Sequence, residues 1–251
     1  MLVYLSCAKL MASSPFFRKM DLSEPIFQQQ AEQHALKFSS LTVDDWSEQL
    51  HIKRDLAAEV WHLYQHFFDH KSQRVPAFFA YNGMVFKKIS ATMLTDAQLE
   101  YAQHHVLIAS FLYGLLRPLD LICPYRLEGK AVLPGSEGQD MFTYWKPLLT
   151  DYFIQQIQAR GGVLINLASQ EMQHMVDWRK VKKQVQVITP EFRVLKEGRL
   201  RNIVIYAKMC RGAMTRFVLQ RQPMNIEELK DFSFEGFQHD PEVGEFFFTL
   251  K

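Results

Sequence analysis

The stretch LLRPLD at residues 115–120, followed by PYRLE at residues 124–128, decides how this sequence is interpreted. It places four charged side chains of mixed sign within twelve residues, between apolar residues and two prolines. Each proline fixes its own φ and disfavours helix at the residue before it. We therefore expect these charges to be held rigidly, either in an internal ion-pair network or facing a bound molecule.

The order of charges within this stretch suggests how they are arranged. Arg117 and Asp120 can pair across the turn, and extended geometry points Arg126 and Glu128 to the same side of the chain. An internal network and a binding site remain equal alternatives here. A metal site built from Asp120, Glu128 and Glu171 would suit Mg²⁺ or Mn²⁺. No spacing requires one, so we predict neither a metal site nor a cofactor.

Composition indicates an ordinary soluble globular protein. The chain has 251 residues, of which 48% are hydrophobic and 22% charged, with no repeat or linker. We predict a single domain over residues 1–251. The apolar start at residues 1–5 is too short for a signal peptide, and no run approaches the length of a membrane helix. The three cysteines are odd in number and far apart in the sequence, which argues against a disulfide framework, so we expect a cytoplasmic protein.

Helices and strands are expected to alternate irregularly, which favours an α+β fold with a mixed sheet surrounded by helices over a doubly wound fold. Ser23 and Thr42 stand at N-cap positions, and Thr95 opens a capping box. The expected strands are residues 2–5, 163–167 and 245–250, and the expected helices are residues 25–38, 43–50, 54–68, 96–105, 141–159, 208–221 and 225–230.

Three segments depend on turn signals or stay ambiguous. Asn82-Gly83 predicts a β-hairpin between residues 77–81 and 84–87. A second hairpin is expected where residues 185–195 and 200–206 pair around the turn at 196–198. Residues 106–113 could form either a strand or the continuation of a buried helix.

The helix at 208–221 is the best physical argument for a binding site. Lys208, Arg211, Gly212, Thr215 and Arg216 share one arc of it, opposite an apolar face. Gly212 weakens the helix by about 1 kcal/mol relative to Ala, which indicates close approach by a ligand or another backbone. The arc predicts an anion site. The alternative is a solvated face, or one paired with acidic side chains such as Asp120 and Glu128.

The charge distribution along the chain bears on the choice between an anion site and a solvated helix face. Residues 178–221 contain twelve Lys or Arg and two acids, although the whole chain carries only +2. Such an excess suggests a basic face that could meet phosphates, whereas a solvated hairpin and helix is the simpler explanation.

Two further groups of polar residues follow expected buried strands. Asn166, Ser169 and Glu171 open a helix whose free N–H groups could bind an anion, although Ser169 could equally be a simple N-cap. Ser6 and Lys9 follow the first strand, and we expect Lys9 to bind phosphate or carboxylate. Cys7, Cys123 and Cys210 each lie inside one of the polar or charged segments described above, which suggests a redox-sensitive cationic site.

Four motifs in the sequence resemble those of the YaaA family of bacterial peroxide-stress-response proteins, and they occur in the family's order over essentially the whole chain. They are Ser6-Cys7-Ala8-Lys9, Tyr113-Gly114-x-x-Arg117-Pro118-Leu119-Asp120-x-x-x-Pro124-Tyr125-Arg126-Leu127-Glu128, Asn166-Leu167-Ala168-Ser169-x-Glu171 and Tyr206-Ala207-Lys208-x-x-Arg211-Gly212-x-Met214-x-Arg216-Phe217.

The resemblance implies a single α+β domain with a positively charged cleft, DNA binding and a role in limiting free intracellular iron. It also implies a helix-hairpin-helix element at residues 110–114, where Phe111 replaces the first glycine of that element. The phosphate-binding residues that match the family motifs are Lys9, Arg117, Arg126, Lys208, Arg211 and Arg216.

We therefore predict a stress-response protein that contacts the DNA phosphate backbone and does not associate with a membrane. The alternative is an enzyme acting on a nucleotide or nucleic acid, or a site for a small anionic molecule, because the motifs hold more acids and amides than phosphate binding needs. The candidate catalytic residues for that alternative are Asp120, Tyr125, Glu128, Asn166, Ser169 and Glu171.

Overall fold

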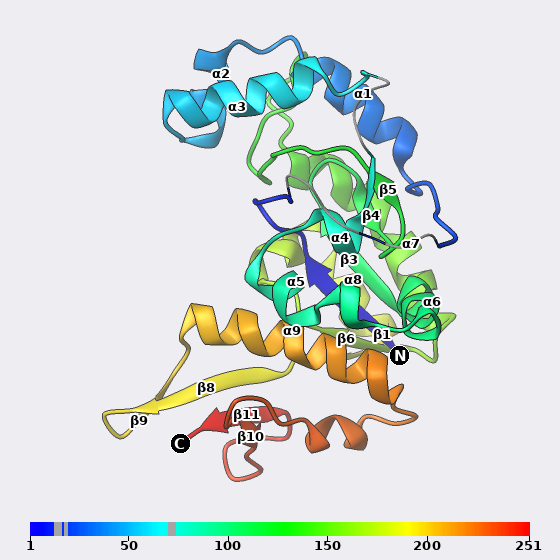
Figure 1. The fold of residues 1–251 in the computed structure, drawn as a ribbon, viewed down its shortest axis with the longest axis vertical. Helices are drawn as coiled ribbons and strands as arrows, with labels where there is room; N and C mark the ends of the chain where they lie inside the picture. Colours follow the sequence, from blue (N-terminus) through cyan, green and yellow to red (C-terminus); the bar gives the residue numbers. More distant parts are fainter. Residues whose placement is uncertain (13–16, 18–19, 70–73) are drawn as a thin grey trace.

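A five-stranded sheet forms the centre of the computed structural model, which describes residues 1–12, 17, 20–69 and 74–251 (Figure 1). Its strand order is β4-β3-β1-β6-β7, and β1 is parallel to both of its neighbours. β7 continues the parallel arrangement, whereas β4 is antiparallel at the opposite edge. The strands are β1 (Leu2–Ser6), β3 (Val106–Ser110), β4 (Gly114–Leu116), β6 (Val163–Asn166) and β7 (Gln186–Ile188).

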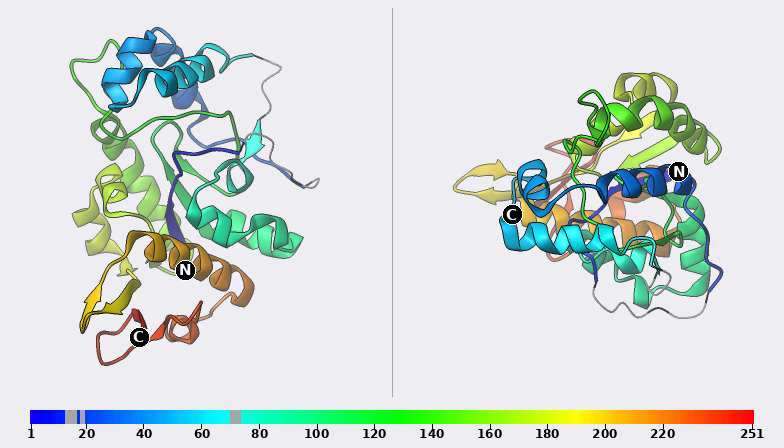
Figure 2. Two further views of the ribbon diagram at one scale, coloured as in Figure 1. Left: turned by 60° about the vertical axis from the view of Figure 1, so that its left-hand side comes forward. Right: turned by 90° about the horizontal axis from the view of Figure 1, so that it is seen from above.

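Helices cover both faces of this sheet. α7 (Met141–Gln158) packs on one face, where the ring of Phe153 lies 4.7 Å from that of Tyr4. α5 (Met84–Ile89), α6 (Asp96–His105) and α9 (Val204–Arg221) lie on the other side, as Figure 2 shows. Because both faces are covered, the central strands are buried along almost their whole length, which explains their continuous apolar sequences.

Three helices form a separate layer at the top of Figure 1: α1 (Gln28–Phe38), α2 (Val43–Leu50) and α3 (Arg54–Gln65). Their shared core is a stack of Phe38, Trp46 and Tyr64, whose neighbouring ring centroids lie 4.6–5.8 Å apart. α2 begins with the capping box of Thr42 and Asp45. The predicted cap at Ser23 is wrong, because α1 begins five residues later and the Ser23 hydroxyl donates to Asp120 instead.

A second sheet lies below α9 in Figure 1, with the order β10-β11-β8-β9. β8 (Glu191–Lys196) and β9 (Arg199–Arg201) form the hairpin predicted around residues 196–198. β10 (Gln238–His239) and β11 (Phe247–Leu250) complete the sheet, after the short 3-10 helix η3 (Glu227–Asp231). The second arm of the hairpin is shorter than predicted, because α9 begins at Val204 and not at Lys208.

The hairpin predicted at Asn82-Gly83 is wrong. The flanking segments are helical, forming α4 (Ala77–Ala80) and α5, and they follow the short strand β2 (Val75–Pro76), which pairs with β5 (Leu121–Ile122). The backbone of this region bonds instead to the segment after β1: Asn82 N–H donates to Leu10 O at 2.9 Å, and Ala12 N–H to Ala80 O at 2.8 Å. A long-range contact thus replaces the local pairing that the dipeptide favours.

Residues 110–114 form a turn between two strands and not a helix-hairpin-helix element. β3 ends at Ser110 and β4 begins at Gly114, and the two pair antiparallel. Gly114 has φ +70, and a Cβ there would lie 2.8 Å from the Trp145 ring. Phe111 is buried, and its carbonyl accepts a hydrogen bond from Trp145 Nε1. The backbone of this turn therefore belongs to the core, which corrects the expected phosphate contact at this place.

The remaining elements agree with the sequence in type more closely than in bounds. The ambiguous segment at 106–113 is a strand as far as Ser110. The helix expected after Ser169 is the 3-10 helix η2 (Gln170–Met175), and α8 (Trp178–Gln184) and the 3-10 turn η1 (Ala91–Met93) are additional. Within the described residues, no helix combines the length and apolar character needed to cross a membrane.

Candidate functional site

Three parallel strands end at the same edge of the central sheet and bring polar residues together there. Ser6 is opposite Ala109 in β3, and Tyr4 is opposite Asn166 in β6. The chain therefore leaves β1, β3 and β6 on one side. In sheets of this kind, ligands bind beyond the carboxyl ends of the strands. We call this region the edge site and define it by Ser6, Cys7, Ser110, Tyr125, Asn166 and Ser169.

Ser6 and Ser169 join the first and third motifs of the sequence. The Ser169 N–H donates to Ser6 Oγ at 2.9 Å, and Ser6 Oγ donates to Ser169 Oγ at 3.2 Å. Ser169 occupies the N-cap position of η2, but its hydroxyl makes no capping hydrogen bond. Its role is thus a cross-link between two strand ends and not the simple cap that the sequence allowed.

Asn166 supports this edge from within. It is buried, its Nδ2 donates to Thr189 Oγ1 at 3.3 Å, and its Oδ1 accepts from the Ala168 N–H at 3.3 Å. These contacts fix the loop after β6 in place. Glu171 is exposed, and its charge contributes to raising the pKa of the Cys7 thiol, which places its carboxylate near the edge site.

A cluster of hydroxyl groups forms the inner wall of the edge site. Tyr125 Oη lies 2.7 Å from both Tyr81 Oη and Ser110 Oγ. Burial raises the pKa of Tyr81 and Tyr125 well above the ordinary tyrosine value. Burial also raises the pKa of Cys7 to about 12, although a hydrogen bond with Tyr125 acts in the opposite direction. The cluster is therefore protonated and uncharged at neutral pH.

Lys9, which follows β1, forms a charge triad with Arg126 and Glu128, which follow Tyr125 in the sequence. Lys9 Nζ is 2.8 Å from Glu128 Oε1, and Arg126 Nη2 is 3.6 Å from the same oxygen. Arg126 and Glu128 thus share a side, as extended geometry predicted. The Arg126 side chain is only 14% exposed, and its buried Nε has no hydrogen-bond partner. Two cations share one carboxylate here, so the triad can still accept an anion.

Arg117 and Asp120 lie elsewhere, in a closed network that we call the clasp. Asp120 is fully buried, and it accepts hydrogen bonds from the Arg117 N–H at 2.8 Å, from Arg117 Nε at 3.0 Å and from the Ser23 hydroxyl at 2.6 Å. Arg117 Nη2 also donates to the Glu24 carbonyl at 2.9 Å. The predicted pairing across the turn is confirmed, and the Arg117 guanidinium is committed to it.

The cations of α9 have a different environment. Lys208 is exposed, and Arg211 and Arg216 are half-buried. Among the described residues, none of these three side chains has a hydrogen bond or an ion pair with a carboxylate. Burial lowers the pKa of Arg211, with no neighbouring acid acting against it. Lys9, Arg126 and Arg117 have carboxylate partners, whereas the α9 cations do not.

Gly212 is the reason α9 approaches α5 so closely. A Cβ at Gly212 would lie 2.2 Å from the Val85 carbonyl oxygen, so only glycine fits at this crossing. The close approach that the sequence indicated is therefore made by a second backbone. Gly212 and Thr215 are both buried and do not belong to an open cationic arc. Gly83, the N-cap of α5, packs on Ala8, so the start of α5 contacts both α9 and the segment that carries Lys9.

Sequence reasoning missed several residues of the site. Tyr81, Ser110 and Thr189 complete the hydroxyl and amide contacts described above, but each stands outside the four motifs. A polar residue at or just after the end of an apolar strand was the available signal for Ser110 and Thr189. Tyr81 was assigned to a hairpin, which concealed its position.

The cysteines do not form a thiolate site. Burial raises the pKa of Cys7 and Cys210 to about 12 and also raises that of Cys123, which is contrary to the expected effect of a cationic environment. Over the ranges that the structure describes, no group of three or more His, Cys, Asp or Glu side chains is arranged to hold a metal ion.

Comparison with known proteins agrees with the motif pattern. Residues 1–243 match the family described as "Peroxide stress protein YaaA". A "UPF0246 protein" of Phocaeicola vulgatus is 46% identical over 240 residues, covering 96% of this chain and 94% of the relative. Relatives with the same description in Bacteroides thetaiotaomicron and Porphyromonas gingivalis are 44% and 43% identical, covering 98% of this chain and 95% and 96% of their own lengths.

Proposed function

Because the chain belongs to the YaaA family of peroxide stress proteins, we propose that it binds DNA through the cations of α9 and the charge triad, and thereby helps to limit free intracellular iron. The basic cleft that the resemblance implies would lie between these two groups. Its walls would be Lys208, Arg211 and Arg216 on one side and Lys9 and Arg126 on the other.

The observation that carries this proposal is the environment of Arg211. Its guanidinium is partly desolvated, which lowers its pKa, and no carboxylate among the described residues compensates for that cost. Lys208, one turn earlier, and Arg216, five residues later, are cationic and also lack acidic partners within the described ranges. Three cations on one helix repel one another unless an anion is bound. A row of phosphates would supply that anion repeatedly.

The charge triad adds a second contact region. The buried Arg126 Nε has no partner, and Glu128 must neutralise Lys9 and Arg126 together. A phosphate oxygen would complete the hydrogen bonds of the guanidinium, which recognises such oxygens well. α5 links the two regions through Gly83 against Ala8 and through Val85 against Gly212. The start of α5 therefore contacts both the segment that carries Lys9 and the middle of α9.

The test is fluorescence anisotropy with labelled duplex and single-stranded DNA at several salt concentrations. Neutralised phosphates release counterions, so affinity should fall steeply as salt increases. The double variant Lys208→Ala/Arg211→Ala should bind more weakly, and its salt slope should be smaller by about 2. The matched control is Lys182→Ala/Lys183→Ala, which removes two exposed cations from α8 and should leave binding unchanged.

Two results would contradict the proposal. One is an affinity for DNA that does not change between low and moderate salt. The other is an equal loss of binding in the α8 control, because that result would indicate an unspecific effect of net charge. Thermal unfolding of both variants must match the wild-type protein for either comparison to count.

The effect on iron is a separate step of the proposal. Cells under peroxide stress that produce the wild-type protein should contain less chelatable iron, measured by electron paramagnetic resonance, than cells producing the Lys208→Ala/Arg211→Ala variant. Equal iron levels in the two strains would separate iron limitation from DNA binding.

A second candidate function is catalysis on a nucleotide, and the arrangement around Tyr125 favours it. Arg126, which pairs with Glu128, directly follows Tyr125 of the hydroxyl cluster, and Lys9 pairs with the same carboxylate. These are the kinds of group that bind a phosphate and move a proton. Chromatographic screening of nucleotides and oligonucleotides would detect turnover, which Glu128→Gln should abolish. Turnover that survives Glu128→Gln would exclude this site as its source.

A further inference from the structure

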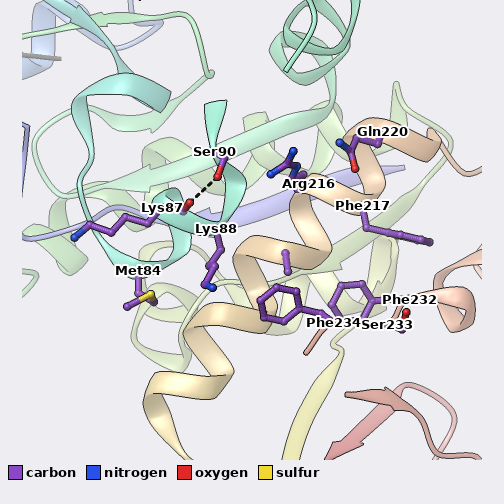
Figure 3. A pocket seen from close by; sticks show the side chains of 11 residues that line it. Met84, Lys87, Lys88, Ser90, Arg216, Phe217, Gln220, Phe232, Ser233 and Phe234 are labelled. Atoms are coloured by element: carbon purple, nitrogen blue, oxygen red, sulfur yellow. Dashed lines mark hydrogen bonds between the residues drawn. The ribbon is translucent and has the colours of Figure 1, made fainter. Parts of the chain in front are cut away.

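A pocket of about 640 Å³ lies between α5, α9 and the chain segment after η3, away from the edge site (Figure 3). This volume is in the range that drug-sized ligands occupy. Among its lining residues are the aromatic side chains Phe217, Phe232 and Phe234, and the polar side chains Ser90, Arg216 and Gln220. The pocket therefore combines a ring-lined wall with a small number of polar groups.

The aromatic wall is arranged with its rings at angles to one another. The rings of Phe217 and Phe232 meet edge to face, with centroids 5.8 Å apart. Phe234 is half-buried and leaves part of its surface open to the pocket. In Figure 3, Phe232 and Phe234 lie below Arg216, and Gln220 lies on the same side as Arg216. A flat ring could stack on this wall while a charged group of the same ligand reaches Arg216.

Arg216 is the cation that the pocket leaves uncommitted. Lys88 also lines the pocket, but its Nζ is 2.8 Å from Glu235 Oε1 and 5.0 Å from the Phe234 ring centroid. Lys87 extends away from Arg216 in Figure 3. Arg216 is half-buried, and its guanidinium has no hydrogen bond or ion pair with any residue that the structure describes. An anion at this place would therefore meet a single, unpaired guanidinium.

Ser90 and Gln220 add hydrogen-bonding groups near this cation. Ser90 follows α5 in a left-handed conformation with φ 52, and its hydroxyl donates to the Lys87 carbonyl at 2.8 Å. The Ser90 oxygen keeps its lone pairs free to accept. Gln220 is exposed at the end of α9, and its amide can both donate and accept. These groups suit a heterocycle with donors and acceptors on its edge.

We propose that this pocket binds a nucleoside phosphate, with its base against the phenylalanine wall and its phosphate on Arg216. Stacking on aromatic side chains is a general mode of base recognition, and a guanidinium recognises a phosphate in two-pronged geometry. The site shares Arg216 with the proposed DNA surface but needs neither Lys208 nor Arg211. The nucleotide can be free or can be the phosphorylated end of a DNA strand, because both present the same chemical group.

The test is competition against a fluorescent N-methylanthraniloyl derivative of adenosine monophosphate bound to the full chain. Adenosine monophosphate should displace the probe, whereas adenosine alone and inorganic phosphate alone should each compete about tenfold more weakly or worse. An oligonucleotide with a 5′-phosphate that competes better than its unphosphorylated form would identify a DNA end as the source. Equal, weak competition by both would identify the free nucleotide.

Variants distinguish this pocket from the DNA surface. Ser233 is exposed and lines the pocket, so Ser233→Phe fills the space without touching the core, and Ser233→Ala is its matched control. Ser233→Phe and Arg216→Gln should each weaken probe binding about tenfold or more. Ser233→Ala and Arg221→Gln, which removes an exposed cation of α9 outside the pocket, should not. Lys208→Ala/Arg211→Ala should keep nucleotide binding even where it loses DNA.

Three results would overturn the proposal. One is the absence of probe binding by the folded wild-type protein. Another is unchanged binding in Ser233→Phe, which would place the nucleotide elsewhere. The third is displacement of the probe by laurate but not by adenosine monophosphate, because that result would indicate a site for an acidic aliphatic compound. Loss of DNA binding in the α9 double variant with retained nucleotide binding would support both proposals, because it separates Lys208 and Arg211 from the pocket.

Discussion

The clasp and the arc of cations on α9 contain similar residues and have opposite surroundings. In the clasp, one buried carboxylate accepts hydrogen bonds from Arg117 and Ser23, and every charge has a partner inside the protein. On α9, Arg211 and Arg216 are half-buried and lack an acidic partner within the described residues. The difference indicates that the first group of charges stabilises the fold, whereas the second is available for a ligand.

The clasp predicts the largest effect on stability. Asp120→Ala removes the acceptor of the Arg117 and Ser23 hydrogen bonds and leaves these donors without it. Breaking a buried ion pair by removing one partner costs about 4 kcal/mol. We expect the free energy of unfolding, measured by urea denaturation, to fall by this amount. Asp151→Ala, which removes the exposed partner of Lys180, is the control and should cost about 1 kcal/mol or less.

A cost similar to the control value in Asp120→Ala would contradict the proposed role of the clasp. It would mean that relaxation of residues 20–24 or water satisfies the freed donors. The distinction between the two groups of charges would then depend on exposure alone.

His34 is a buried polar residue without the partners that Asp120 has. It is 1% exposed, its ring packs 4.3 Å from Tyr144 and 5.4 Å from Trp145, and neither ring nitrogen has a hydrogen-bond partner. Burial lowers its pKa from 6.5 to about 4. Between these two values the unfolded chain binds a proton that the folded protein does not, so stability decreases as pH falls through this window.

The expected size of this decrease is about 3 kcal/mol between pH 6.5 and pH 4. Above pH 6.5 both states are neutral at this position, and the contribution of His34 should not vary. Because carboxylates also titrate in this window, the measurement is the difference between wild type and His34→Phe in urea denaturation at each pH. Parallel pH profiles for the two proteins would show that His34 is not buried in its neutral form.

Local sequence signals predicted the elements whose stabilising contacts are also local. Thr42 is the N-cap and Thr95 opens the capping box that the sequence predicts, and Thr42 also forms a capping box with Asp45. Asn82-Gly83 failed because Asn82 bonds to Leu10, a contact that no local pattern contains. Gly212 was informative for a physical reason, since a glycine inside a helix suggested close approach before its partner was known.

The candidate site was predictable as a set of residues but not as an arrangement. The motifs contain Lys9 and Glu128. That these two charges pair, although they are far apart in the sequence, follows only from the order of the strands. The sequence also could not tell that Arg117 is bound within the fold whereas Arg126 is not fully satisfied. Both are arginines close to a proline in the same stretch. Burial of Asp120 and the unpaired Nε of Arg126 make that distinction.

The crossing of α5 and α9 predicts an intermediate effect. Gly212→Ala should improve helix propensity slightly, but its Cβ would lie 2.2 Å from the Val85 carbonyl oxygen, which the backbone of α5 holds in place. Forcing the helices apart should lower the free energy of unfolding by about 2 kcal/mol. Gln220→Ala, at an exposed position of the same helix, is the control and should be close to neutral in thermal denaturation. A stabilised Gly212→Ala protein would contradict the tight crossing.

Replacing one arginine by methionine in each group of charges compares the two groups directly, and the smallest effect on stability is expected on α9. Arg211→Met removes a partly desolvated charge that has no acidic neighbour among the described residues, so stability should change by less than about 1 kcal/mol and can increase. Arg117→Met leaves buried Asp120 without its ion-pair partner and should cost several times more. DNA binding should show the reverse order, with the salt slope reduced by about 1 for Arg211→Met only. Equal losses of stability in the two variants would mean that Arg211, too, is held within the fold, and the assignment of α9 to a ligand would then fail.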